Sequence, residues 1–152
     1  MAAAGTKYII AGDIGGTNSR FSLHIPGQRD PLLVHVYANE EALQTAPNYH
    51  HATLEPYLEK CLDEVEQWKA MGRDAVLDQV QIVACLATAG PVKRDNTVFM
   101  TNIANGGCTI DGNDIEKCQD GLLSLILRCK LVNDFVGQGY GALDLDLDEE
   151  VV

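Results

Sequence analysis

The chain has 152 residues, of which 46% are hydrophobic and 22% charged, a balance typical of one globular domain and not of a disordered chain. Its formal net charge is −11, which argues against sequence-independent binding to nucleic acid and against a polybasic membrane contact. No apolar run approaches the roughly 18 residues that would span a bilayer, and the start lacks a signal-peptide pattern, so we expect a cytoplasmic protein with no membrane partner.

Three strands are predicted in the first part of the chain. Residues 7–14 are an apolar, β-rich run that ends in Gly-Asp, and residues 19–25 alternate apolar and polar side chains. The Gly-Gly pair between them predicts a hairpin. Residues 32–38 form a third strand candidate, separated from the second by turn-forming proline and glycine.

One long helix is predicted over residues 53–71, because its apolar positions recur three and four residues apart. Thr53 is the expected N-cap and Gly72 the expected stop. Trp68 continues the apolar stripe, which favours a place in the core over a role in stacking on a ligand.

The second half of the chain predicts further strands and short helices. Residues 80–90 are nearly continuously apolar and end in Gly-Pro, a pattern typical of a strand buried on both faces. A short strand is expected over 97–102 and a short helix over 111–118. Residues 122–135 are ambiguous: the first half suits a helix, the second a strand, and a glycine-rich helix start follows. This order predicts an α/β domain with a mixed sheet.

The cysteines and histidines suggest no metal or disulfide chemistry. The five cysteines are odd in number and contain no C-x-x-C pair, which favours reduced thiols, with Cys85 buried in its apolar run, over a disulfide framework or a zinc knuckle. No two of the four histidines have the spacing of a metal-binding pair on a helix, so we assign them no chemistry.

The segment Gly12-Asp13-Ile14-Gly15-Gly16-Thr17 is the most informative motif. A Gly-Gly pair after a strand lets the backbone turn and brings bare N–H groups close to an anion. Asp13 stands where a carboxylate can hold a magnesium ion or its water shell. The dinucleotide fingerprint and the Walker loop are both excluded by the glycine spacing and by the absence of Gly-Lys-Ser/Thr. The alternative is an ordinary hairpin turn.

Two later segments also end strands with residues suited to chemistry. Ala89-Gly90-Pro91 closes one strand, and its alternative reading is a simple exit turn. Asn133 and Asp134 close another, at the strand end where open α/β folds place ligands. An aspartate there can take a proton from a hydroxyl that the asparagine orients. The alternative is that the pair only caps the following helix.

In order and spacing, four segments resemble the amino-terminal lobe of the bacterial-type glucokinases, within the sugar kinase/Hsp70/actin superfamily. They are GDIGGTNSRFSL (12–23), ACLATAGPV (84–92), MTN (100–102) and LVNDF (131–135). The resemblance runs from about residue 7 to about residue 143. It implies a ribonuclease-H-like (actin-like ATPase) lobe, with a mixed β-sheet flanked by helices, in an enzyme that phosphorylates glucose at its 6-hydroxyl with ATP and Mg²⁺.

The resemblance also assigns roles to individual residues. Asp134 matches the catalytic base and a sugar ligand, and Asn133 matches the neighbouring sugar-binding residue. Asp13 is expected near Mg²⁺ through water. The residues that match the loop around the ATP phosphates are Gly12, Asp13, Ile14, Gly15, Gly16 and Thr17.

Two departures from the family pattern bear on these expectations. Gly106-Gly107-Cys108 stands where the family commonly has a tryptophan-containing stretch. The family also continues into a second, larger lobe with further residues that bind the sugar and adenosine. Residues 1–152 are therefore expected to be a single amino-terminal small lobe that is inactive by itself. The resemblance also implies a possible homodimer for the full-length protein, since many relatives form one. The alternatives are a non-catalytic sugar- or nucleotide-binding lobe, a truncated product, or a kinase for another hexose.

Overall fold

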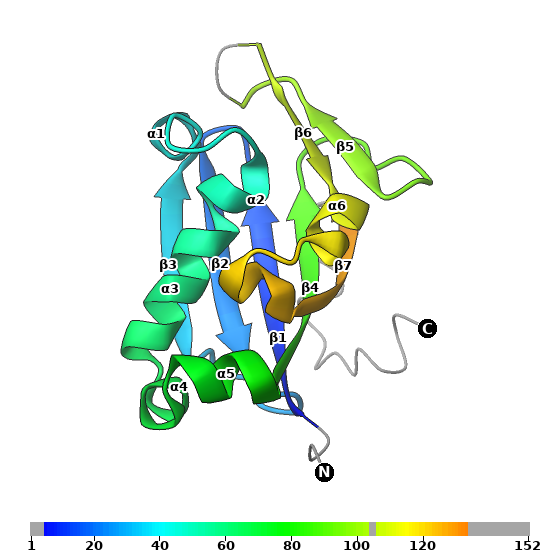
Figure 1. The fold of residues 1–152 in the computed structure, drawn as a ribbon. Helices are drawn as coiled ribbons and strands as arrows, with labels where there is room; N and C mark the ends of the chain where they lie inside the picture. The colour runs from blue at the N-terminus through cyan, green and yellow to red at the C-terminus, as the bar shows by residue number, and fades with distance from the viewer. Residues whose placement is uncertain (1–4, 104–105, 134–152) are drawn as a thin grey trace.

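Five strands form one mixed sheet in the order β3-β2-β1-β4-β7 (Figure 1). The computed structural model describes residues 5–103 and 106–133. The expected helix start after residue 134 lies outside them. The strands are β1 (Thr6–Ile14), β2 (Asn18–His24), β3 (Leu33–Ala38), β4 (Val80–Thr88), β5 (Thr97–Met100), β6 (Cys108–Asp111) and β7 (Ile126–Asn133). The helices are α1 (Asn39–Ala42), α2 (Tyr49–Ala52), α3 (Leu54–Glu64), α4 (Glu66–Met71), α5 (Arg73–Gln79), α6 (Gly112–Lys117) and the 3-10 helix η1 (Gly121–Leu125).

The strand pairing confirms the predicted hairpin and the mixed sheet. β1, β2 and β3 are consecutive antiparallel neighbours, whereas β4 runs parallel to β1 and β7 runs parallel to β4. The parallel pairs place Ile14 beside Thr88 and Thr88 beside Asn133. The carboxyl ends of β1, β4 and β7 therefore lie side by side at one edge of the sheet.

A second, two-stranded sheet extends the molecule beyond that edge. β5 and β6 pair antiparallel, and Figure 1 shows them past the arrowhead of β4. β5 begins at the predicted position. β6 was not predicted, because four residues carry too short an alternation to stand out.

The described helices lie on one face of the five-stranded sheet (Figure 1). Along β4, every second residue from Val80 to Thr88 is fully buried, and the residues between them are only half-buried. The prediction that this strand is buried on both faces is therefore wrong: the face turned away from the described helices keeps some exposure. For the same reason Cys85 is half-buried, and the fully buried thiols are those of Cys61 and Cys129. All five cysteines are free, as predicted.

The predicted helix over 53–71 is interrupted at Val65, which separates α3 from α4. Val65 has an extended backbone and is 2% exposed. The break redirects the chain, so that both Val65 and Trp68 reach the core, where the Trp68 ring meets Tyr8 edge-on at a centroid distance of 5.4 Å. Gly72 ends α4 with a φ of 85°. Thr53 does not act as the expected side-chain cap, since its hydroxyl donates instead to the Tyr49 carbonyl.

Short elements account for the remaining differences from the predictions. α1, α2 and α5 have four to seven residues each, too few for a helical repeat to show in the sequence. The ambiguous segment 122–135 divides into η1 and then β7. None of the helices in the described part of the chain is long and apolar enough to cross a membrane.

Candidate functional site

The motifs that stand out in the sequence lie at the carboxyl edge of the sheet. Because Ile14, Thr88 and Asn133 are neighbours in register, the loop after β1, the turn after β4 and the end of β7 all leave the sheet side by side. The Ala89 N–H donates to the Ile14 carbonyl at 3.1 Å, which ties the first two of these exits together. Asp134 follows Asn133 directly in the chain but lies outside the described residues.

The predicted phosphate loop is divided between a strand and a turn. Gly12, Asp13 and Ile14 belong to β1, whose backbone N–H groups face strands on both sides and serve the sheet. The N–H of Gly15 donates to the Asn18 carbonyl at 2.9 Å within the turn. Gly16 and Thr17, at the tip of the turn, are thus the part of the loop that can present N–H groups to an anion.

Gly16 is required by a close approach and not by an unusual backbone angle. The glycines with positive φ in the described ranges 5–103 and 106–133 do not include Gly15 or Gly16. A Cβ added at Gly16 would instead stand 3.1 Å from the Cβ of Asn102. The same addition at Gly15 would meet only the Asn18 carbonyl, at 3.8 Å. The turn therefore rests on the loop after β5 through Gly16.

A buried asparagine supports this turn from inside. Asn39 is fully buried, and its amide donates to the carbonyls of Gly15 at 2.8 Å and Gly16 at 3.3 Å. Its side-chain oxygen accepts from the Ser19 hydroxyl at 2.6 Å. The backbone N–H of Asn39 donates to the Thr17 carbonyl at 2.8 Å. Asn39 thereby holds the turn through both its side chain and its backbone N–H.

Tyr49 completes the support under the loop. Its hydroxyl donates to the Ser19 Oγ at 2.6 Å, and both side chains are buried. Burial raises the pKa of the Tyr49 phenol far above its ordinary value, so the group remains a neutral donor at physiological pH. No sequence signal marks Asn39 or Tyr49, because their partners lie 20 or more positions away along the chain.

Replacing Asn39 with alanine is expected to lower the free energy of unfolding by about 1–3 kcal/mol, since it leaves the Ser19 hydroxyl and the Gly15 carbonyl without their buried partner. Urea unfolding of the complete protein measures this loss. The control is Asn18→Ala, whose side chain is exposed and whose replacement should change stability by less than about 0.5 kcal/mol. Equal effects in the two variants would contradict the supporting role of Asn39.

A cavity of about 380 Å³ lies between the turn and the β5–β6 sheet. It is lined by Gly16, Ala89, Gly90, Pro91, Lys93, Phe99, Met100, Thr101 and Asn102. The segments 89–91 and 100–102, which are separate motifs in the sequence, therefore form its walls. Among the described residues, the predicted phosphate loop contributes only Gly16 to this lining.

Gly90 is the point where the β4 exit meets the other two segments. A Cβ at Gly90 would lie 2.8 Å from the Val98 Cγ2, so a larger residue would push β5 away. The carbonyl of Gly90 accepts from the Asn133 side-chain amide at 3.3 Å and from the Thr88 hydroxyl at 3.3 Å. The Asn133 side chain is thereby held against Gly90, one of the residues that line the cavity.

Two other positions of interest lie around this cavity. Asp13 is exposed on the sheet face turned away from the described helices, across from Arg20 in register, and is not among the residues that line the cavity. At the Gly106-Gly107 departure, Gly107 has a φ of 88°, and an added Cβ would stand 2.5 Å from the Phe99 ring. The missing side chain at Gly107 leaves room for Phe99, an aromatic wall of the cavity that is 48% exposed.

Comparisons with known proteins agree with this architecture. The family model described as Glucokinase matches residues 10–152. A glucokinase from Synechocystis sp. (strain ATCC 27184 / PCC 6803 / Kazusa) is 29% identical over 155 residues, covering 100% of this chain and 38% of that protein. A glucokinase from Chromohalobacter salexigens is 32% identical over 146 residues, covering 96% of this chain and 37% of that protein.

A solved structure shares the fold. The crystal structure of glucokinase from Balamuthia mandrillaris in complex with glucose matches with a TM-score of 0.57 at 20% identity, over 98% of this chain and 35% of that one. The predicted fold class, a mixed α/β lobe of the actin-like ATPase type, is confirmed. The chain spans a little over a third of the length of these relatives.

Proposed function

Because the chain belongs to the glucokinase family, we propose that it forms the amino-terminal small lobe of an enzyme that transfers a phosphoryl group from ATP to the 6-hydroxyl of glucose. The observation that carries this proposal is a cavity at the carboxyl edge of the sheet that is lined by Gly16 and Gly90, with the Asn133 amide hydrogen-bonded to the Gly90 carbonyl. Such an edge is where open α/β folds bind their ligands.

The turn after β1 is proposed to hold the phosphates. Phosphoryl transfer depends mainly on positioning and on neutralising charge, so a rigid backbone cradle is well suited to it. Gly16 and Thr17 supply the tip of that cradle, and Asn39 keeps it in place from below. The exposed Asp13 carboxylate fits a Mg²⁺ ion held through water, because oxygen ligands and retained water suit this ion. When bound, Mg²⁺ would neutralise phosphate charge.

The end of β7 is proposed to hold the sugar. The Asn133 amide donates to the carbonyl of Gly90, a residue of the cavity lining. We assign Asp134 as the general base that accepts the proton of the 6-hydroxyl, with Asn133 orienting that hydroxyl. Lys93, in the cavity wall, adds a positive charge that favours an anionic phosphate there.

The proposal is tested by assaying the complete protein with glucose, ATP and Mg²⁺ in a reaction that couples glucose 6-phosphate to a dehydrogenase. We expect turnover that requires all three components and a higher kcat/KM for glucose than for fructose, mannose or galactose. Glucose binding without turnover would favour the non-catalytic alternative, and a higher kcat/KM for another hexose would replace glucose as the substrate.

Residues 1–152 alone are expected to show no measurable turnover. The relatives are more than twice as long, and in a two-lobe kinase both lobes clamp the substrates and exclude water. Each 1.4 kcal/mol of lost contact energy lowers the affinity for glucose about tenfold, so we also expect weak glucose binding. We further expect the 152-residue chain to fold only marginally. Calorimetry and the coupled assay on the 152-residue chain, with the complete protein at equal molarity, measure glucose binding and turnover. Robust turnover from this chain would contradict the proposed division into lobes.

A further inference from the structure

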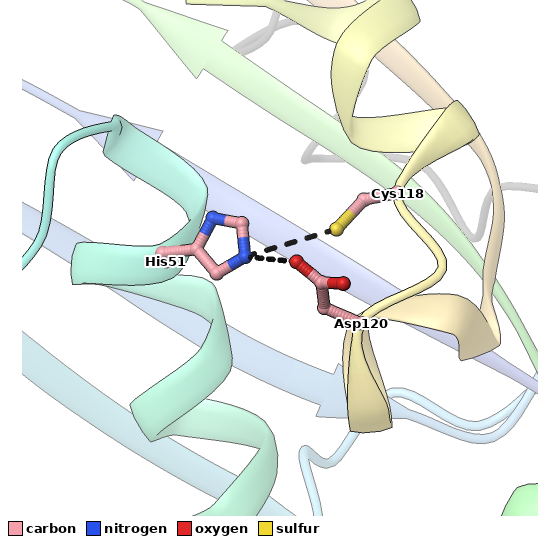
Figure 2. Close-up of side chains that lie close together, drawn as sticks. All are labelled: His51, Cys118 and Asp120. Carbon is pink, nitrogen blue, oxygen red and sulfur yellow. Dashed lines mark hydrogen bonds and ion pairs between the residues drawn. The ribbon is translucent and has the colours of Figure 1, made fainter.

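Three potential metal-binding side chains meet away from the cavity (Figure 2), and the first of them lies 67–69 positions before the other two in the sequence. His51 lies on α2, whereas Cys118 and Asp120 lie in the connection between α6 and η1. The His51 Nε2 is 2.8 Å from the Asp120 Oδ2 and 4.0 Å from the Cys118 Sγ. All three ligand atoms lie within 4.8 Å of one another.

The Asn48 side chain shows that the Nδ1 of His51 carries a proton. The Asn48 Oδ1 accepts from the backbone N–H of His51 at 2.9 Å, which identifies that atom as the amide oxygen. The same oxygen is 2.7 Å from the His51 Nδ1, so Nδ1 must carry a proton to donate. The Nε2 faces Cys118 and Asp120 (Figure 2). In the ion pair it donates its proton to the Asp120 carboxylate at 2.8 Å, and a metal ion that displaces this proton takes the Nε2 lone pair.

This is the arrangement that metal-ligating histidines have in proteins: one ring nitrogen binds the ion, and the other donates to an oxygen that fixes the ring. Nitrogen, sulfur and carboxylate oxygen together suit a borderline ion such as Zn²⁺, and three protein ligands leave a fourth tetrahedral position for water. We propose that His51, Cys118 and Asp120 form a site for Zn²⁺ or a similar divalent transition-metal ion.

The distances are compatible with this ion after small movements. Zinc bond lengths and tetrahedral angles place ligand atoms about 3.4–3.5 Å apart. The nitrogen–oxygen pair must therefore open, and the nitrogen–sulfur pair must close, by roughly half an ångström each. The Asp120 side chain is 70% exposed, so it is free to turn and leaves a path for the ion, while the His51 side chain is 22% exposed and held by Asn48.

The site lies apart from the proposed kinase chemistry but is connected to its support. α2 starts with Tyr49, whose hydroxyl holds Ser19 beneath the phosphate loop. An ion bound by His51, Cys118 and Asp120 fastens α2 to a segment 67–69 positions further along the chain. It therefore stabilises the small lobe. The competing interpretation is a simple ion pair between protonated His51 and Asp120, in which the thiol of Cys118 has no part.

Co²⁺ titration of the metal-free complete protein tests the site, because a cysteine thiolate bound to Co²⁺ gives a ligand-to-metal absorption band that an ion pair does not. We expect one equivalent of Co²⁺ to produce this band and Zn²⁺ to displace it. Cys118→Ser should abolish the band, whereas the control Cys85→Ser, another half-buried thiol, should keep it. Absence of the band in the parent protein, or its loss only in the control, would overturn the proposal.

Two further measurements keep the test independent of folding and of catalysis. In the unmodified protein, Zn²⁺ should protect Cys118 from alkylation, as read by mass spectrometry, and leave the labelling of Cys108 unchanged. Asn48→Asp retains an acceptor for both N–H groups of His51 and should bind metal at least as tightly, whereas Asn48→Leu should bind about 10–100-fold more weakly. Equal Cys118 labelling with and without Zn²⁺, or equal affinity in the two variants, would overturn the site.

Discussion

Replacing Asp134 with asparagine is expected to lower the kcat of the complete protein by about 10²–10⁴-fold, with little change in glucose affinity. The amide keeps the size of the side chain and its ability to bind a hydroxyl, but it cannot accept the proton of the 6-hydroxyl. The coupled assay measures kcat, and calorimetry with glucose measures binding. This split between rate and affinity is what separates a base from a residue that only holds the sugar.

The matched control is Asp78→Asn, which removes the same charge from an exposed position in α5, near the start of β4 and at the opposite end of the sheet from the cavity. It should leave kcat and glucose affinity unchanged. Near-native turnover of the Asp134 variant would refute its assignment as the base. Loss of glucose binding with retained kcat would reassign Asp134 to sugar binding alone.

Replacing Gly16 with valine is expected to reduce kcat/KM for ATP by about 10²-fold, while the α/β fold is retained. The added Cβ would stand 3.1 Å from the Asn102 Cβ, and its branches would extend the clash into the cavity or displace the turn. A displacement of about an ångström at a phosphate cradle is enough for a loss of this size. Steady-state kinetics with varied ATP and circular dichroism provide the two readouts.

A pair of alanine variants isolates the cause of that loss. Gly16→Ala adds a Cβ against Asn102, whereas Gly15→Ala adds one that meets only the Asn18 carbonyl at 3.8 Å. We expect the Gly16 variant to lose more kcat/KM for ATP than the Gly15 variant. Equal losses would mean that contact with Asn102 is unimportant, and unchanged ATP kinetics in Gly16→Val would mean that the turn is only a hairpin.

The elements that the sequence predicted correctly are those whose pattern is local. Alternation in 19–25 and the apolar run 80–90 each specify a strand, because neighbouring side chains point to opposite faces of a sheet. The end of β7 at Asn133 could be read in the same way. The prediction of one continuous helix over 53–71 failed at Val65. Packing against the core decides where the helix is interrupted, and the spacing of apolar residues contains no information about that position.

By itself, the sequence determined the strand-forming segments other than β6, the glycine turn at 15–16 and the family to which the chain belongs. Only the tertiary structure decided how the motifs combine, because it brings residues far apart in the chain within hydrogen-bonding distance. Asn39 supports Gly15 across 24 positions, and His51 meets Asp120 across 69. Such contacts depend on strand order and on which sheet face the helices cover. These are properties of the whole chain packing around one core, and no short stretch of sequence contains them.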